Sequence, residues 1–213
     1  MTQLLFVRHG ESKSNEGGFF TGQTDVPLSD LGREQAAALK EYILHNYRIE
    51  KIYSSDLQRA YSTVLPIAQA LHLPVQKEKM LREIYGGEWE EKTVQYIQEH
   101  FPHDYAMWHD DIGLSRCTGG ESMLELQHRA IKIVNKIAAE NDGKTVLIGT
   151  HAGFLRAMLC YWKGLPPEKM REIPWVPNAS VTQVEYSEGK YRVLFAGESS
   201  FLQGMITKLA KGM

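Results

Sequence analysis

The stretch that decides the fold class is Thr145-Val146-Leu147-Ile148-Gly149, an apolar run that we interpret as a buried β-strand. The apolar segment Phe154–Trp162 follows it with a helical pattern. Between the two stand polar and small residues, namely Thr150-His151-Ala152-Gly153. The sequence therefore predicts that these residues lie where a strand ends and a helix begins.

The same alternation of short strands and longer helices extends outward from this stretch. Other predicted strands are Leu4–Val7, Lys51–Tyr53 and one around Val75, with a terminal hairpin formed by residues 181–186 and 191–196. Helical patterns follow Ser29 and Asp30, cover Leu57–Leu71 with an expected kink at Pro66, and begin at the capping-box spacing of Ser122 and Glu125. Strands alternating with helices predict an α/β fold with a largely parallel sheet.

Composition limits the classes of protein that this chain can represent. Its 213 residues favour one domain, and the 43% apolar share is enough for a substantial core. The formal net charge of −2 argues against a globally basic nucleic-acid binder, and no apolar run is long enough to span a membrane. No signal peptide is recognisable, and the two cysteines, Cys117 and Cys160, cannot form a disulfide framework. We therefore expect a reduced, cytoplasmic protein.

Residues 79–118 interrupt the regular pattern. This stretch carries Trp89, Trp108 and three histidines among mixed polar residues. We interpret it as a cap-like excursion over the sheet edge and the active site, inserted in a single domain that covers residues 1–213. We also expect the last dozen residues to be loosely ordered.

Three predicted strands run into polar segments that carry cationic groups. Arg8 and His9 follow the first, Arg59 follows the second, and His151 follows the strand at Thr145–Gly149. Ligands of parallel sheets bind beyond the carboxyl ends of the strands, so these four side chains are expected to converge. Converging cations repel one another unless an anion lies between them, and arginine forks match phosphate oxygens. The pattern predicts a phosphate-binding site.

The ordered motifs resemble those of the histidine phosphatase superfamily, in the branch of cofactor-dependent phosphoglycerate mutases and related phosphatases. The resemblance covers nearly the whole chain and implies a three-layer α/β/α fold like that of phosphoglycerate mutase. It is carried by these segments: Leu5–Ser12 with Asn15, Thr21-Gly22, Asp25–Ser29 with Gly32, Ser54–Ala60, Leu81-Arg82-Glu83, Gly119–Ser122 and Thr150–Gly153.

The resemblance also implies a role for each site residue. His9 would be the nucleophile that forms a phosphohistidine, and Glu83 would protonate the leaving group and then activate water. Arg8, Arg59 and His151 would surround the transferring phosphoryl group. Further substrate contacts are expected from Asn15, Thr21, Gly22 and Ala152. No metal and no cofactor is expected.

Two features favour a phosphatase over a mutase that uses the same pocket. Mutases usually carry an inserted segment with paired arginines. In this chain the only permanently cationic residues between Trp89 and Gly119 are Lys92 and Arg116, and they are not adjacent. Ala152-Gly153 also stands where mutases typically have Gly-Asn. Aromatic residues are candidates for an apolar mouth that admits bulkier substrates: Phe19, Phe20, Tyr85, Trp89 and Trp108.

Two other classes stay open at this point. A module that binds phosphate esters without turnover would not need both His9 and Glu83. A metalloenzyme could use the dense set of possible ligands between residues 100 and 111, namely His100, His103, Asp104, His109, Asp110 and Asp111, although their spacing matches no firm zinc pattern. The expected partner is a small phosphorylated metabolite, not a nucleic acid or a membrane. Its identity and the formation of a homo-oligomer are left open.

Overall fold

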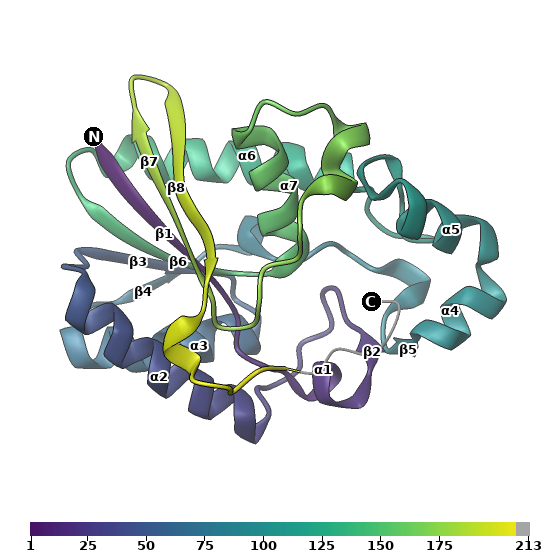
Figure 1. Cartoon of the computed structure of the whole chain (residues 1–213), viewed down its shortest axis with the longest axis horizontal. Helices are drawn as coiled ribbons and strands as arrows, with labels where there is room; N and C mark the ends of the chain where they lie inside the picture. Colours follow the sequence, from purple (N-terminus) through teal and green to yellow (C-terminus); the bar gives the residue numbers. More distant parts are fainter. Residues whose placement is uncertain (208–213) are drawn as a thin grey trace.

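A six-stranded sheet runs through the molecule. The computed structural model describes residues 1–207. The strand order is β4-β3-β6-β1-β7-β8 (Figure 1). Neighbours among the first four strands are parallel, and the last two strands run antiparallel to their neighbours. The bounds are β1 (Thr2–Arg8), β3 (Lys51–Ser54), β4 (Val75–Lys77), β6 (Thr145–Thr150), β7 (Val181–Ser187) and β8 (Lys190–Glu198). This confirms the α/β class and the predicted terminal hairpin.

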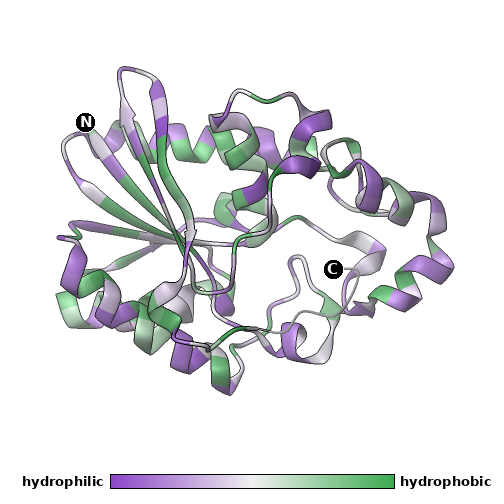
Figure 2. Cartoon of the chain, viewed as in Figure 1, coloured by the Kyte–Doolittle hydropathy of each residue, from purple (hydrophilic) through white to green (hydrophobic). Residues whose placement is uncertain are grey.

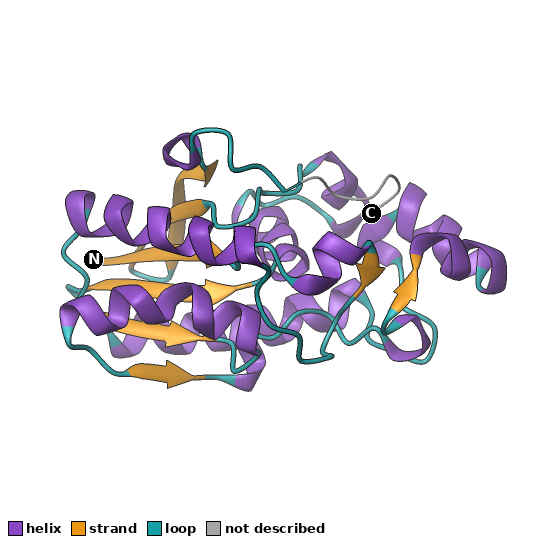
Figure 3. Cartoon of the chain, turned by 90° about the horizontal axis from the view of Figure 1, so that it is seen from below, coloured by secondary structure: helices purple, strands orange, loops and turns teal. Residues whose placement is uncertain are grey.

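Helices cover both faces of the sheet, which gives the expected three layers (Figure 3). One face packs against α2 (Asp30–Asn46) and α3 (Gln58–Leu71), and the other against α6 (Met123–Glu140) and α7 (Ala152–Trp162). Because side chains alternate along a strand, Leu5 and Val7 of β1 join the first core and Leu4 and Phe6 join the second. Figure 2 shows the apolar strands between helices that are hydrophilic on their outer sides.

Local sequence explains where several helices begin. Ser29 caps α2 by accepting the Gly32 N–H, and Ser122 and Glu125 form the predicted capping box of α6. Pro66 lies inside α3 but does not end it, and the helix continues to Leu71. Buried neighbours such as Val64 and Ile67 hold this helix against the sheet, which offsets the hydrogen bond that proline removes.

Residues 79–118 form a series of short elements beside the sheet. They comprise η1 (Lys79–Leu81), η2 (Gly87–Trp89), β5 (Lys92–Thr93), α4 (Val94–His100), α5 (Pro102–Asp110) and η3 (Ile112–Leu114). β5 pairs with β2 (Phe19–Phe20), which follows the short helix α1 (Lys13–Gly17). This pairing connects the segment to the loops after β1.

The last helix or strand among the described residues is η5 (Ser200–Leu202), which follows the loop that contains η4 (Pro167–Glu172) and the hairpin. The expected loose order of the last dozen residues concerns in part residues 208–213, which lie outside the described residues. None of the helices in residues 1–207 is both long and apolar enough to cross a membrane.

Candidate active site

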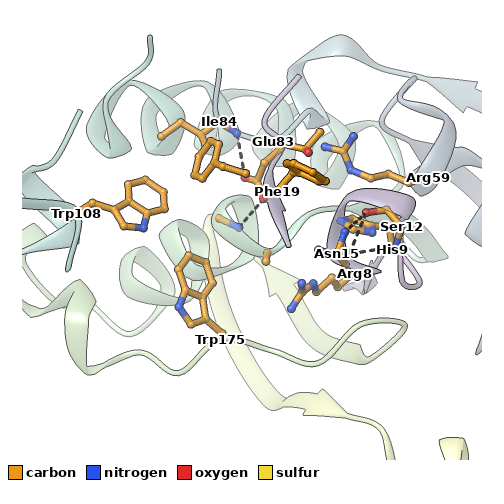
Figure 4. Close-up of a pocket in the computed structure, with 14 residues that line it drawn as sticks. Arg8, His9, Ser12, Asn15, Phe19, Arg59, Glu83, Ile84, Trp108 and Trp175 are labelled. Atoms are coloured by element: carbon orange, nitrogen blue, oxygen red, sulfur yellow. Dashed lines mark hydrogen bonds between the residues drawn. The ribbon is translucent and has the colours of Figure 1, made fainter. Parts of the chain in front are cut away.

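A pocket lies at the carboxyl ends of β1, β3 and β6, where parallel sheets of this kind bind ligands (Figure 4). It is lined by Arg8, His9, Ser12, Asn15, Phe19, Phe20, Thr21, Arg59, Glu83, Ile84, Trp108, Ala152, Gly153 and Trp175. Seven of the nine predicted site residues are in this set. The other two, Gly22 and His151, are adjacent to the pocket and do not line it.

His9 is the first residue after β1, and its ring lines the pocket although only 5% of the residue is exposed. Its Nδ1 lies 2.7 Å from the Gly10 carbonyl oxygen. A carbonyl can only accept, so Nδ1 carries the proton and Nε2 keeps its lone pair. Burial, together with the positive charges of Arg59 and Arg8, holds the pKa of His9 well below 6.5. His9 is therefore a neutral imidazole with a nucleophilic nitrogen at neutral pH.

Arg8 and Arg59 are buried cations without a carboxylate partner. Neither forms an ion pair within residues 1–207, and their guanidinium groups donate instead to backbone carbonyls. Burial lowers the pKa of each to about 10, so both remain charged at neutral pH. The Arg8 Nε has no hydrogen-bond partner in the described chain. Two buried positive charges that no carboxylate pairs directly, beside a neutral imidazole, make a site for an anion.

His151 lies against His9, with 5.2 Å between the ring centroids. It is fully buried, and burial followed by the charge of Arg59 lowers its pKa well below 6.5. Its Nε2 is 2.9 Å from Ser55 Oγ, whose oxygen also accepts the Leu57 N–H. The Nδ1 of His151 has no partner among the described residues. One nitrogen of this ring is thus fixed by the protein, and the other is free to bond a ligand.

Asn15 reaches the pocket from α1. Its Oδ1 accepts the Ser12 backbone N–H at 3.1 Å and thereby closes the capping box of that helix. The side chain of Asn178 also donates to this oxygen at 3.3 Å. Because the oxygen is used in this way, the amide group that Asn15 can offer a ligand is its Nδ2 donor.

The carboxylate of Glu83 is held by two backbone N–H groups. Oε1 accepts from Ile84, and Oε2 accepts from Gly153 in the first turn of α7, both at 2.9 Å. A Cβ at position 153 would lie 2.4 Å from Glu83 Oε1, so glycine lets the carboxylate approach α7 without a shift of the Glu83 side chain. The residue that distinguishes this chain from the mutase pattern thus has a direct physical role beside Glu83.

Arg129 of α6 supports Glu83 from behind, and sequence reasoning missed it. Its guanidinium donates to the carbonyl oxygens of Met80, Arg82 and Glu83 at 2.7–2.9 Å. It also makes a two-bond ion pair with Glu121, at 2.7 and 2.9 Å. Nothing in the sequence distinguished Arg129 from other helical arginines, because the backbone carbonyls that it holds beside Glu83 lie 46–49 positions earlier in the chain.

Glu90 is a second residue that the sequence did not reveal. Its carboxylate accepts four backbone N–H groups, from Gly22, Gln23, Thr24 and Gly86. The loop ordered in this way offers the carbonyls of Gly22 and Thr24 to Arg59, at 2.6 and 3.0 Å. Gly22 therefore positions Arg59 from outside the pocket, whereas the neighbouring Thr21 lines it with a buried hydroxyl that has no partner in the described chain.

The predicted aromatic mouth is present in part. Phe19, Phe20 and Trp108 line the pocket. Trp89 does not, because it is 1% exposed and packs edge-on against Phe20 and Trp108, and the Tyr85 side chain is exposed elsewhere. Trp175, from the loop before β7, completes the lining and was not predicted.

The histidines of residues 100–111 do not gather into a metal site. His103 and His109 each contact the aspartate that follows them, and His100 contacts the Tyr96 carbonyl. Within the part of the chain that the structure describes, no group of three or more His, Cys, Asp and Glu side chains is arranged to hold a metal ion.

Comparison with known proteins finds relatives with a similar sequence and a similar fold. A phosphoserine phosphatase from Hydrogenobacter thermophilus is 31% identical over 194 residues, which is 91% of each chain. The structure of Bacillus stearothermophilus YhfR has a TM-score of 0.90 and 31% identity, and the match covers 95% of this chain and all of that one. A mycobacterial glucosyl-3-phosphoglycerate phosphatase solved with VO3 has a TM-score of 0.85 and 30% identity, covering 92% and 99%.

The family model of the histidine phosphatase superfamily (branch 1) matches residues 4–198. This range contains every residue placed in the pocket above. The chain belongs to the histidine phosphatase superfamily.

Proposed function

We propose that this protein is a phosphomonoester hydrolase that acts through a phosphohistidine at His9 Nε2. The observation that carries the proposal is the neutral His9 beside two buried arginines that lack carboxylate partners. This arrangement fits a phosphate dianion next to a nucleophile. The similarity of the chain to phosphatases, one of which was solved with VO3, also supports phosphoryl-transfer chemistry.

The reaction proceeds in two halves. His9 Nε2 attacks phosphorus, a P–N bond forms, and the ester P–O bond breaks. The protonated Glu83 carboxyl gives its proton to the departing alkoxide. Water then loses a proton to the Glu83 carboxylate as it attacks phosphorus, the P–N bond breaks, and inorganic phosphate leaves. The second half restores His9 and the protonated Glu83.

The other site residues stabilise charge on the phosphoryl oxygens. Arg8 and Arg59 supply guanidinium donors and Asn15 supplies its amide. His151, which lies against His9 just outside the pocket lining, supplies its unpartnered Nδ1 as a donor when its Nε2 accepts from the Ser55 hydroxyl. Ala152 lines the pocket at the start of α7, where a helix favours negative charge. Phosphate-monoester hydrolysis is among the slowest reactions without a catalyst, so several fixed donors are needed.

Residues 79–118 act in this proposal as a cap that completes the mouth of the same pocket. Trp108 of this segment lines the pocket, and β5 pairs with β2 next to Thr21. The substrate is a small phosphorylated metabolite. Both cysteines are free and buried, in keeping with a cytoplasmic location.

The decisive experiment follows phosphate release and traps the intermediate. We expect release from para-nitrophenyl phosphate with a chelator present, and a covalent phosphoryl label on His9 in rapidly quenched samples. Glu83→Gln should accumulate this label, since para-nitrophenolate leaves without a proton but water still needs a base. His9→Ala should carry none.

Three outcomes would contradict the proposal. The first is that a chelator abolishes the activity and that added metal restores it. Another is binding of phosphate esters without turnover. The third is rapid interconversion of phosphoglycerates with negligible hydrolysis, which would indicate a mutase.

A further inference from the structure

The pocket has two unlike ends. We call Arg8, His9, Arg59 and Glu83 the phosphoryl site, and Phe19, Phe20, Trp108 and Trp175 the aromatic wall. Figure 4 shows the two tryptophans at one end of the pocket and the arginines at the other. Building on the proposed hydrolase function, we infer that the substrate is the phosphate ester of an uncharged alcohol with an aromatic or similarly apolar body, without a second acidic group.

Charge supports this substrate class. Among the described residues that line the pocket, the only cations at neutral pH are Arg8 and Arg59, and both belong to the phosphoryl site. A carboxylate on the alcohol portion would lie against the aromatic wall without a positive partner. Moving an unpaired carboxylate out of water into such surroundings is unfavourable. Phosphoserine and phosphoglycerate both carry such a carboxylate.

A third arginine lies near the wall but is not available to a substrate. The guanidinium of Arg156 stacks on Trp175, 4.3 Å from the ring centroid. It donates to the Met170 and Arg171 carbonyls and is 9% exposed. This cation holds the ring of Trp175 and is not among the residues that line the pocket.

Three rings of the aromatic wall, Phe20, Trp108 and Trp175, are held in place by contacts with one another. Trp108 stacks on Trp175 with 6.5 Å between centroids and meets Phe20 edge-on at 5.6 Å. Buried Trp89 supports both Phe20 and Trp108 from behind. Ordered aromatic rings bind an apolar body with little further loss of conformational freedom. The unpartnered Thr21 hydroxyl is a neutral polar group that a hydroxyl or ether oxygen of the alcohol can use.

The test compares two esters that differ by one carboxylate. The full chain is assayed with benzyl phosphate and para-carboxybenzyl phosphate, and with O-phosphoserine as a third substrate. We expect kcat/KM to be about tenfold or more higher for benzyl phosphate than for either acidic ester. A preference below about threefold, or a reversed one, overturns the inferred class. Failure to release phosphate from any ester, para-nitrophenyl phosphate included, instead overturns the hydrolase function and the substrate class with it.

A second experiment introduces a positive charge at the edge of the pocket and measures its effect on the preference between the two benzyl esters. Phe19 is 41% exposed at the pocket edge, so Phe19→Arg can introduce a cation without disturbing the core. We expect the ratio of kcat/KM for para-carboxybenzyl over benzyl phosphate to rise about tenfold in Phe19→Arg. The matched variant Phe19→Gln, which is polar but uncharged, should leave this ratio near that of the unmodified protein. Equal ratios in the two variants would show that charge at the mouth does not govern selection and would overturn the inference.

Discussion

The phosphoryl site and the aromatic wall occupy one pocket but are built in different ways. Residues of the phosphoryl site mostly follow the ends of parallel strands, and each is fixed by hydrogen bonds to backbone groups. The wall takes its four rings from β2, α5 and the loop before β7. Three of these rings, Phe20, Trp108 and Trp175, are held by contacts with one another. The residues that we propose to react with phosphate therefore lie at the end of the sheet, whereas the rings that we propose to select the substrate lie in the segments around it.

Loss of the nucleophile should have the largest effect. His9→Ala removes the atom that forms the P–N bond, so kcat/KM for para-nitrophenyl phosphate should fall at least about 10⁴-fold. Circular dichroism and thermal unfolding should change little, since the sheet does not depend on this ring. His103→Ala, at an exposed histidine of α5, is the matched control and should keep full activity. A His9→Ala protein that keeps most of its rate would refute the covalent mechanism.

Loss of Arg129, which holds the backbone around Glu83, should have the second-largest effect on activity. Arg129→Met removes three hydrogen bonds to the backbone of residues 80–83, and the proton donor loses its fixed position. We expect kcat/KM for ethyl phosphate to fall about tenfold to a hundredfold, and less for para-nitrophenyl phosphate, whose leaving group needs no proton.

The control for this variant is Arg116→Met, which breaks an exposed ion pair with Glu125 and should leave both rates unchanged. The informative quantity is the difference between the two esters. Equal losses on both would mean that Arg129 supports the fold or the phosphoryl site in general, and not the proton donor.

The two ends of the pocket should also differ in their response to pH. Burial keeps His9 and His151 neutral in the folded protein, with pKa values well below 6.5, whereas the unfolded chain protonates both rings below about pH 6.5. The unfolded state then binds more protons, so the free energy of unfolding should fall as the pH decreases. We expect a loss of about 2 kcal/mol between about pH 6.5 and about pH 5.5, measured by urea unfolding.

His151→Gln should remove about half of this pH dependence, because one of the two rings is gone. Trp108→Ala should leave the dependence unchanged even if it lowers stability overall, since the aromatic wall holds no group that titrates in this range. A slope that is the same in all three proteins would show that His151 does not contribute to the pH dependence.

Removal of one ring from the aromatic wall should have the smallest effect, and it should change only the preference between substrates. Trp108→Ala should lower the ratio of kcat/KM for benzyl phosphate over ethyl phosphate by about threefold to tenfold. Measuring both esters on one preparation cancels any loss of folded protein. Tyr161→Ala, at an exposed aromatic residue of α7 that does not line the pocket, should leave this ratio unchanged. An unchanged ratio in Trp108→Ala would separate the wall from substrate recognition.

Sequence patterns predicted the sheet and most of the phosphoryl site because these depend on local rules. The buried strand at Thr145–Thr150 and the capping box at Ser122 each depend on residues that are close together in the chain. The sequence places Arg8, Arg59 and His151 at the ends of three strands. The sheet order β3-β6-β1 makes these strands neighbours and so brings the three side chains to one edge. Glu83 required the family resemblance, since nothing local distinguishes it from a surface glutamate.

Other features depended on contacts between residues far apart in the chain. Glu90 orders a loop 66–68 positions earlier, Arg129 holds residues that precede it by 46–49 positions, and Trp175 meets Trp108 across the pocket. Periodicity, caps and strand ends act over a few residues, so the succession of strands and helices along the chain and the cationic character of the phosphoryl site could be read from local patterns. The side chains that support this site and the rings that line the pocket could not, because packing brings together positions that no local pattern connects.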